Sequence, residues 1–330
     1  MKKILICGSS GFIGRNLLDN FTRVRHFSEE EFEVKAVWHK NANITELYRN
    51  VEWVQGDLTN SKDVQRIVTS DIDVILQYAA VTSGAKDIVS KPYVHVTDNA
   101  VMNSLLMREA FEKEVGHFIF PSCTLMYQSS DELLKETDVD ENVDIFSKYY
   151  GAGNTKLYLE KMCKFYSDLG KTKFTVLRQS NIYGSYDKFD LERSHVFAAT
   201  IVKVVNAVEE VVVWGEGKEK RDLLHVEDLV SCVEKVMKQQ SQFELINVGI
   251  GEGIEISELV KKVVDIYKKD LYIRYDKTKP CFGNKLTLII ISILFNYKFQ
   301  DATSGLRFYH KETFFKILKI KNNKFDIQLI

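Results

Sequence analysis

The chain has little of several features that mark particular classes of protein. Its 330 residues include only three prolines, so it holds no proline-rich linker. Lysine and arginine number 45 against 46 aspartates and glutamates, and the net charge of −1 gives no overall field that would attract nucleic acid. The longest apolar run, 286–295, has about ten residues, too few to cross a bilayer. What remains is the composition of a soluble globular protein, 45% hydrophobic and 28% charged.

Cysteine is also scarce, and its spacing shows no pairing. The five cysteines are an odd number without a C-x-x-C pair, and they are Cys7, Cys123, Cys163, Cys232 and Cys281. We interpret them as reduced, mostly buried thiols of a cytoplasmic protein. No charged and then apolar leader opens the chain, because the first apolar run has only four residues. We expect no metal site.

The most informative stretch is 3–14. Apolar residues of β type run into glycines spaced G-x-x-G-x-x-G, and a helix-like stretch, 15–21, follows at once. The first glycine allows the turn, the second lets backbone approach a pyrophosphate, and the third lets the helix pack closely on the strand. Unpaired N–H groups at the positive helix end would face the phosphates, and the alternative is a glycine-rich turn without a ligand. The predicted cofactor-binding residues here are Gly8, Gly11, Phe12, Ile13 and Gly14.

Strand-like and helix-like stretches alternate through the first half of the chain. The expected strands after the first are 34–38, 51–54, 74–78, 117–120 and 174–177, with helical patterns between them such as 98–114 and 155–169. Such alternation implies a parallel sheet that is covered on both faces. We therefore predict an α/β fold, a Rossmann-type doubly wound parallel sheet with a small C-terminal substrate lobe. Ligands in such sheets bind beyond the carboxyl ends of the strands.

Several residues at those strand ends suit a dinucleotide. Asp57 and Leu58 follow the third strand, and the aspartate can accept a hydrogen bond from an adenine amino group. Alternatively, Asp57 caps the helix that starts near Ser61. Ala79 and Ala80 end the fourth strand, where small side chains let a cofactor pass closely.

The end of the second strand bears on the choice between two cofactors. An acidic residue there would favour a free ribose 2′-hydroxyl, whereas a basic one tolerates a 2′-phosphate. This chain has His39 and Lys40 at that place and no acid. The pattern favours NADP, with NAD as the alternative.

Ordered motifs across 1–280 resemble one family. They are the three glycines, Asp57-Leu58, Ala79-Ala80, Asn99, 177–184, 221–229 and 247–249. On these residues the chain resembles the extended short-chain dehydrogenase/reductases, the NAD-dependent epimerase/dehydratase family. The resemblance implies a nucleotide-sugar substrate, a homodimer, and Asn99 as a further cofactor-binding residue. The implied domains are a dinucleotide-binding domain at 1–178, to which 222–250 returns, and a substrate lobe made of 179–221 and 251–282.

Further motifs are similar to the GDP-L-fucose synthase branch of that family. They are 186–189, 194–196, 213–217, Arg221 and 276–280. The resemblance implies epimerisation at C3 and C5 of a GDP-4-keto-6-deoxy sugar and reduction of its C4 ketone with NADPH. It makes His195 the acid in epimerisation, a role that suits histidine near neutral pH, unless His195 is a core or capping residue. The implied substrate-binding residues are Lys203, Trp214 and Arg221 at the diphosphate, with Arg178 and Asn181 shaping the sugar pocket.

The family's catalytic pattern, Ser/Thr with Tyr-x-x-x-Lys, is only partly present. Lys156 matches the family lysine, which holds the nicotinamide ribose, but Ala152 stands four residues before it. The nearest tyrosines are Tyr150 and Tyr149, six and seven residues earlier. Because two glycines lie between and weaken a helix, we expect the helix to begin near Asn154. One tyrosine, with Tyr150 preferred, would then swing in from a loop; otherwise both only pack.

The fifth strand runs into Ser122, Cys123 and Thr124. In the fucose synthase branch a serine here steadies the substrate oxygen and a cysteine is the epimerisation base. Aligned on Ser-Cys, Cys123 is the base; aligned on the tyrosine that follows, it replaces the serine. Ser122 and Thr124 are the hydroxyl candidates, and the alternative is that Cys123 is a small buried hydrophobe.

The last segment departs from the family. The motif Asp-x-Thr-Ser-Gly-x-Arg at 301–307 resembles a fragment of a family-2 glycosyltransferase that lacks the nucleotide-binding half. We interpret 283–330 as a foreign tail from a gene fusion or deletion. The sequence therefore predicts an NADP(H)-dependent nucleotide-sugar epimerase/reductase. The alternatives are an NAD-dependent UDP-sugar 4-epimerase or dehydratase, and a catalytically silent cofactor-binding protein.

Overall fold

The structure is a computed structural model. It describes residues 1–22, 32–40, 42–81, 91–130, 132–189, 191 and 194–277. The foreign tail expected at 283–330 and Cys281 lie outside these residues, so those interpretations stay predictions.

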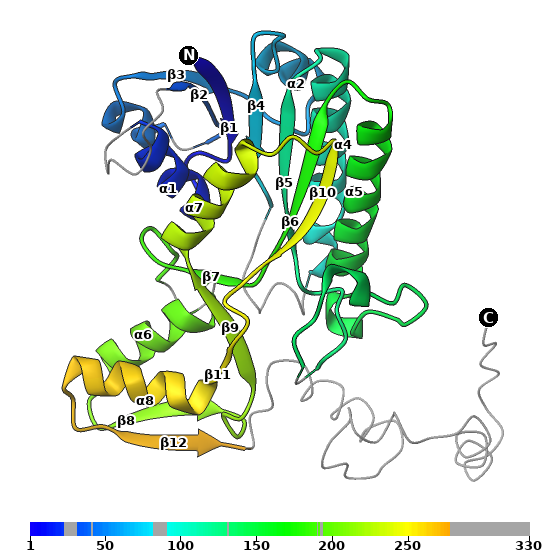
Figure 1. The fold of residues 1–330 in the computed structure, drawn as a ribbon. Coiled ribbons are helices and arrows are strands. Elements are labelled where there is room, and N and C mark those ends of the chain that lie inside the picture. Colours follow the sequence, from blue (N-terminus) through cyan, green and yellow to red (C-terminus); the bar gives the residue numbers. More distant parts are fainter. Residues whose placement is uncertain are drawn as a thin grey trace, which may run out of the picture.

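Seven strands form the main sheet, in the order β10-β6-β5-β4-β1-β2-β3 (Figure 1). All neighbouring pairs are parallel. The chain builds outward from β1 on one side and then from β4 on the other, which puts the topological switch point between β1 and β4. The predicted doubly wound α/β sheet is confirmed. Its strands are β1 (Lys2–Cys7), β2 (Phe32–Trp38), β3 (Val51–Gln55), β4 (Val74–Gln77), β5 (His117–Cys123), β6 (Lys173–Gln179) and β10 (Phe243–Val248).

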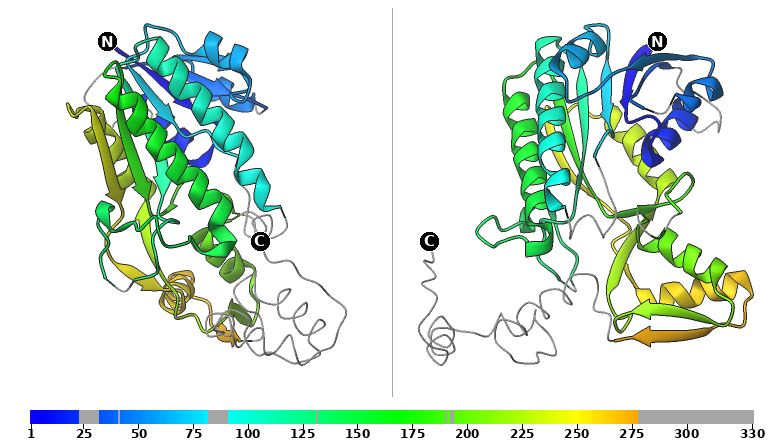
Figure 2. Two further views of the ribbon diagram at one scale, coloured as in Figure 1. Left: turned by 90° about the vertical axis from the view of Figure 1, so that its right-hand side faces the viewer. Right: turned by 180° about the vertical axis from the view of Figure 1, so that it is seen from behind.

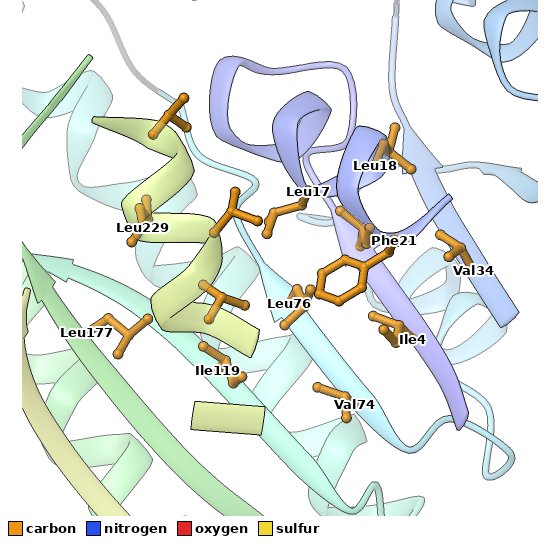
Figure 3. Packing of buried hydrophobic residues seen from close by; sticks show 14 of the residues in the cluster. Ile4, Leu17, Leu18, Phe21, Val34, Val74, Leu76, Ile119, Leu177 and Leu229 are labelled. Carbon is orange, nitrogen blue, oxygen red and sulfur yellow. The ribbon is translucent and has the colours of Figure 1, made fainter. Parts of the chain in front are cut away.

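Helices cover both faces of this sheet because successive side chains along each strand point to opposite faces. Ile4 and Ile6 pack under α1 and α7, and Leu5 and Cys7 pack under α2, α4 and α5. Figure 3 shows the first cluster, where Leu17 and Phe21 of α1 approach the sheet residues. The helices are α1 (Phe12–Phe21), α2 (Ser61–Ile67), α4 (Thr97–Glu112), α5 (Tyr150–Asp168) and α7 (Val226–Met237).

A small lobe lies beyond the carboxyl ends of the main strands (Figures 1 and 2). It has a three-stranded sheet, β11-β9-β7, and a two-stranded sheet, β12-β8, with α6 and α8 packed on a small apolar core. Its elements are β7 (Asn181–Tyr183), α6 (Val196–Asn206), β8 (Glu210–Trp214), β9 (Lys220–His225), β11 (Gly253–Glu255), α8 (Ile256–Tyr267) and β12 (Tyr272–Asp276). Short 3-10 helices are η1 (Asn43–Leu47), η2 (Pro92–His95), η3 (Glu136–Asp138) and η4 (Ser147–Tyr149).

One expected boundary is wrong. Helix α5 begins at Tyr150 and not near Asn154. The glycines that were expected to break it serve close packing instead: a Cβ at Gly151 or Gly153 would lie 2.9 or 2.8 Å from side chains of neighbouring segments. The helix therefore runs through both glycines, since tertiary contact outweighs their low helix propensity.

Candidate functional site

The glycine motif forms a cradle between β1 and α1. Gly8 has φ +74°, and a Cβ there would lie 2.5 Å from the nitrogen of Ala79. A Cβ at Gly14 would lie 2.2 Å from the carbonyl oxygen of Gly8, so only glycine fits at this contact. Helix α1 begins at Phe12 after Gly11, which has extended backbone and provides no side-chain cap. The uncapped N–H groups and the positive helix end fit a dinucleotide pyrophosphate.

Asp57 sits beyond the end of β3 as expected. Its Oδ1 accepts the Thr59 N–H at 2.9 Å and the Thr59 hydroxyl at 2.7 Å, and these bonds lower the pKa of the carboxyl group. Its Oδ2 lies 3.9 Å from Nε2 of the exposed His39, while Leu58 beside it is buried. Helix α2 is capped by Asn60, whose side chain accepts an N–H of the first turn at 2.9 Å. The capping alternative for Asp57 is therefore wrong, and its adenine contact stays a prediction.

Asn99 of α4 holds the segment that leaves β4. Its Oδ1 accepts the Val81 N–H at 2.9 Å, and its Nδ2 donates to the Val81 carbonyl at 3.0 Å. The side chain of Gln77 donates to the Ala79 carbonyl at 3.0 Å. These bonds hold the backbone on either side of Ala80 in place where Ala79 contacts Gly8 of the cradle. Asn99 thus positions this loop, and its direct contact with a cofactor stays a prediction.

Lys156 reaches from α5 to the carboxyl end of β5. Its Nζ donates to the carbonyl of Pro121 at 2.6 Å and lies 4.6 Å from the ring centre of Phe120. Burial lowers the pKa of Lys156 and raises the pKa of Cys123, although the Lys156 charge and the Leu125 N–H act in the opposite direction on the thiol. A thiolate at Cys123 would therefore have an ammonium group and an N–H to stabilise it.

Ser122 and Arg178 belong to a buried network behind this strand end. The Ser122 hydroxyl donates to the Glu160 carboxylate, and Nη2 of Arg178 donates to the same carboxylate at 2.7 Å. Nη1 of Arg178 donates to the Tyr127 hydroxyl at 2.9 Å. Arg178 thus ties β6 to α5, and its expected place in the sugar pocket stays a prediction. Since Ser122 also turns toward α5, the exposed Thr124 is the hydroxyl that remains at the strand end.

Two residues of this network, Glu160 and Tyr127, were not predicted from the sequence. One signal was present for Glu160, because it stands four residues after Lys156 and so shares a face of α5 with it. No comparable spacing pointed to Tyr127, whose hydroxyl donates to Asn247 on the distant strand β10 at 2.7 Å.

The tyrosines at the start of α5 are not arranged as expected. Tyr150 is the first helical residue and is 53% exposed. Six residues turn a helix through about 600°, which leaves Tyr150 about 120° around from Lys156. Tyr149 precedes the helix, two turns before Lys156 on the same side, and its ring centre lies 6.1 Å from that of Phe146. Ala152 occupies the place one turn before Lys156. The loop geometry that favoured Tyr150 is therefore wrong, and the helix favours Tyr149.

His195 precedes the first turn of α6. Its ring makes no capping bond and is exposed, so the core and capping alternatives are both wrong. The Ser194 hydroxyl donates to the Lys188 carbonyl at 2.5 Å. Asp187, one residue before Lys188, is buried, and burial raises the pKa of its carboxyl group. The lobe thus presents the His195 imidazole to solvent, and its role as an acid stays a prediction.

The structure brings together two of the predicted substrate-binding residues. Nζ of Lys203 on α6 lies 4.8 Å from the ring centre of Trp214 on β8, a cation–π arrangement. Arg221 on β9 is exposed, and its Nη1 donates to the neighbouring carbonyl at 2.7 Å. Asn181 donates to the Asp222 carbonyl at 3.1 Å and so ties β7 to β9. Direct contact of these residues with a substrate stays a prediction.

Within the described part of the chain, no group of three His, Cys, Asp or Glu side chains is placed to hold a metal ion. None of the helices in those ranges combines the length and apolarity that a membrane span needs. Cys7, Cys123, Cys163 and Cys232 are all free thiols.

Comparison with known proteins agrees with this geometry. The model of the NAD dependent epimerase/dehydratase family matches residues 4–249. GDP-L-colitose synthase of Yersinia pseudotuberculosis is 24% identical over 313 residues, covering 92% of this chain and 95% of that protein. GDP-L-fucose synthase of Azorhizobium caulinodans is 26% identical over 287 residues, covering 84% and 85%. The solved UDP-glucose 4-epimerase of Thermotoga maritima superposes with a TM-score of 0.72 at 24% identity, covering 85% of this chain and 87% of that one.

Proposed function

The chain belongs to the NAD dependent epimerase/dehydratase family, and from that membership we propose that it is an NADP(H)-dependent nucleotide-sugar epimerase/reductase. Its proposed substrate is a GDP-4-keto-6-deoxy sugar, as the names of two relatives, GDP-L-colitose synthase and GDP-L-fucose synthase, suggest. The observation that carries the proposal is the approach of Lys156 to the strand end that holds Cys123, in a sheet that also carries the glycine cradle.

The cofactor proposal depends on the end of β2. His39 and Lys40 are both exposed there, and no acidic side chain takes the place that would bind a ribose 2′-hydroxyl. A 2′-phosphate would meet two side chains able to carry positive charge. When bound, NADPH supplies the hydride for reduction at C4, and the alternative cofactor is NAD.

The proposed epimerisation uses groups from both parts of the molecule. Cys123, as the thiolate, removes the proton from the carbon next to the C4 ketone, and the electron pair moves toward the ketone oxygen. His195 returns a proton to that carbon from the opposite face, which inverts the centre. The exposed hydroxyl of Thr124 donates a hydrogen bond to the ketone oxygen, where negative charge develops.

Nucleotide recognition is assigned to the lobe. We place the guanine-nucleotide diphosphate near Lys203 and Arg221, because both are cationic and the arginine fork can bond two phosphate oxygens at once. The Trp214 ring, which already packs against Lys203, offers a surface for the base.

A second candidate function is supported by Ala152. Without a tyrosine one turn before Lys156, the usual phenol for protonating the C4 oxygen is missing from its place. A catalytically silent protein that only binds the cofactor would have the same glycine cradle and would also lack this tyrosine.

The test follows NADPH absorbance with the purified full-length chain and a GDP-4-keto-6-deoxy sugar. We expect NADPH to be consumed, and we expect Lys156→Met to abolish consumption while Lys161→Met, an exposed lysine on the same helix, changes little. A UDP-sugar 4-epimerase would instead interconvert UDP-sugars with NAD and no net redox change. Binding of NADPH without turnover of any 4-keto nucleotide sugar would establish the silent protein.

A further inference from the structure

A cavity lies between α1 and α7, the two helices that pack side by side on the sheet in Figure 3. Its volume is about 260 Å³, room for several water molecules or for a short chain. Of the described residues, no lysine or arginine lines it. The polar residues of its wall are Asn16 and Asn20 of α1 and Glu227, Asp228, Ser231 and Glu234 of α7. The cavity is therefore strongly acidic.

The two asparagines use their N–H groups within the protein and leave oxygens over. Asn20 is 1% exposed, and its Nδ2 donates to Oε1 of Glu234 at 3.0 Å. Its Oδ1 is buried and has no hydrogen-bond partner in the part of the chain that the structure describes. Nδ2 of Asn16 donates to the carbonyls of Phe12 and Ser185 at 3.0 and 2.8 Å, so both of its N–H groups are in use. Because a buried oxygen without a partner is unfavourable and rare, the wall of this cavity lacks a donor.

The chemistry of the wall determines the class of ligand that would complete it. Ionised carboxylates only accept hydrogen bonds, whereas an ammonium group only donates them and carries the opposite charge. A single metal ion does not fit, because no three acidic, histidine or cysteine side chains of the described residues converge on one point. Glu227 and Glu234 are two turns apart on α7, about 10 Å along the helix axis, and Ser231 lies between them on the same face. The complementary positive charge must therefore be spread along a chain.

We infer that this cavity binds a linear aliphatic polyamine, a small molecule whose ammonium groups are separated by methylene chains. One ammonium group donates to Oδ1 of Asn20 and to the carboxylate of Glu234. A second lies between the carboxylates of Glu227 and Asp228 in the first turn of α7, and the methylene groups pass over Val230. The inference goes beyond the proposed function, because it depends on neither the dinucleotide nor the sugar.

Calorimetry of the full-length chain at low ionic strength, without nucleotide, tests the inference. The titrants are spermidine, n-butylamine, which has a single ammonium group, and magnesium chloride. We expect the wild type to bind spermidine at one site and the other two at least about tenfold more weakly, because only the polyamine reaches both ends of the cavity. Glu234→Gln should weaken spermidine binding about tenfold, the effect of one charge-assisted hydrogen bond. Asp228→Asn should weaken it about threefold, because Asp228 is exposed.

Two controls separate the site from general charge effects and from folding. Glu258→Gln removes the same charge from the exposed surface of α8 and should leave the spermidine affinity unchanged. Without ligand, Glu234→Gln should unfold at the wild-type temperature, because the amide oxygen can still accept the bond from Asn20. If it unfolds earlier, the exposed Asp228→Asn variant decides the outcome.

Three results would overturn the inference. The first is a wild type that binds no spermidine. The second is magnesium or n-butylamine binding as tightly as spermidine, which would show a site for any cation. The third is an equal loss of spermidine affinity in Glu258→Gln and Glu234→Gln, or no loss in Glu234→Gln and Asp228→Asn, which would show only a general attraction to an acidic surface. A failure to bind NADPH would refute the proposed function and leave this inference intact.

Discussion

The close contact between α1 and the turn at Gly8 depends on Gly14 having no side chain. A Cβ there would meet Gly8 O at 2.2 Å and Gly8 C at 2.7 Å, and this backbone cannot turn aside as a side chain can. We expect Gly14→Ala to weaken dinucleotide binding about tenfold or more and to lower the free energy of unfolding by about 1–3 kcal/mol. Gly11→Ala, whose Cβ would lie 3.2 Å from the same oxygen, should lose less stability. Calorimetry and urea denaturation measure the two effects, and equal destabilisation would contradict the packing argument.

His117 at the start of β5 makes a prediction about acid stability. Its Nε2 lies 2.8 Å from the Thr175 hydroxyl in the core, and burial lowers the pKa of His117 from 6.5 to about 4. The unfolded chain therefore takes up a proton below pH 6.5 that the folded protein refuses until about pH 4. The contribution of His117 to the free energy of unfolding is therefore complete above pH 6.5. It falls by about 3 kcal/mol as the pH drops toward 4.

The measurement is urea unfolding of the wild type and of His117→Gln between those two pH values. Glutamine can still meet the Thr175 hydroxyl but does not titrate, so the variant should lose about 3 kcal/mol less than the wild type over this range. His39→Gln, at an exposed position, is the control and should follow the wild type. Parallel curves for wild type and His117→Gln would show that His117 titrates normally.

At the scale of single elements, helix α5 decides which tyrosine can serve Lys156. The helix begins at Tyr150, whose side chain lies about 120° around from Lys156, while Tyr149 lies on the Lys156 side. We expect Tyr149→Phe to lower kcat for NADPH oxidation at least about tenfold, the size of a lost proton donor, and Tyr150→Phe to change it less than about twofold. Thermal unfolding of both variants controls for packing. A larger effect at Tyr150 would restore the loop geometry that the sequence suggested.

The same helix marks how far the sequence could predict the elements. Continuous apolar runs such as 117–120 identified the buried parallel strands, because such strands have no polar face. The start of α5 could not be read, since Gly151 and Gly153 look like breakers until the side chains packed against them are known. Strand β10 was not predicted, because Glu244 and Asn247 interrupt its apolar residues without a regular alternation and only pairing with β6 selects the strand.

The residues of the candidate site also divide into those that the sequence could predict and those that it could not. The cradle could be predicted because its three glycines recur every third residue in a short motif, and Asp57 because it lies two residues after the end of a strand. The ion pair of Arg178 could not be predicted, since its partner Glu160 stands on another element and only the fold brings the pair together. Spacing along the chain reports local contacts, whereas the contacts between β6 and α5 depend on the whole sheet.

For the molecule as a whole, the lobe is anchored to the helix that forms the cradle. The side chain of Asn16 on α1 donates to the Ser185 carbonyl at 2.8 Å, and the Tyr186 hydroxyl donates to Asp19 at 2.9 Å. The guanidinium of Arg15 lies 4.0 Å from the ring centre of Tyr186. The helix of the predicted cofactor cradle and the predicted substrate lobe are therefore joined by direct side-chain contacts. A lobe fixed in this way can hold a sugar against the carboxyl ends of the main strands.

The outer face of α4 and α5 leads to a prediction about assembly. Tyr158 and Phe165 of α5 and Leu169, which follows its last residue, are 44%, 52% and 49% exposed, and their spacing puts them on one stripe of the helix. Val101 on the neighbouring α4 is 39% exposed. Exposed apolar side chains on neighbouring helices are typical of an interface, and they support the homodimer that the family resemblance implies.

We expect the wild type to sediment as a dimer in analytical ultracentrifugation at micromolar concentration. Phe165→Glu places a charge in the middle of the stripe and should yield monomers. Their unfolding midpoint should be lower than that of the wild type and should no longer rise with protein concentration, because the partner no longer stabilises the fold. Ile266→Glu on α8, where the isoleucine is 77% exposed, is the matched control and should remain dimeric. Since α5 carries both this stripe and Lys156, dissociation should also lower NADPH turnover as the protein is diluted. A monomeric wild type, or a dimeric Phe165→Glu variant, would show that this face is not the interface.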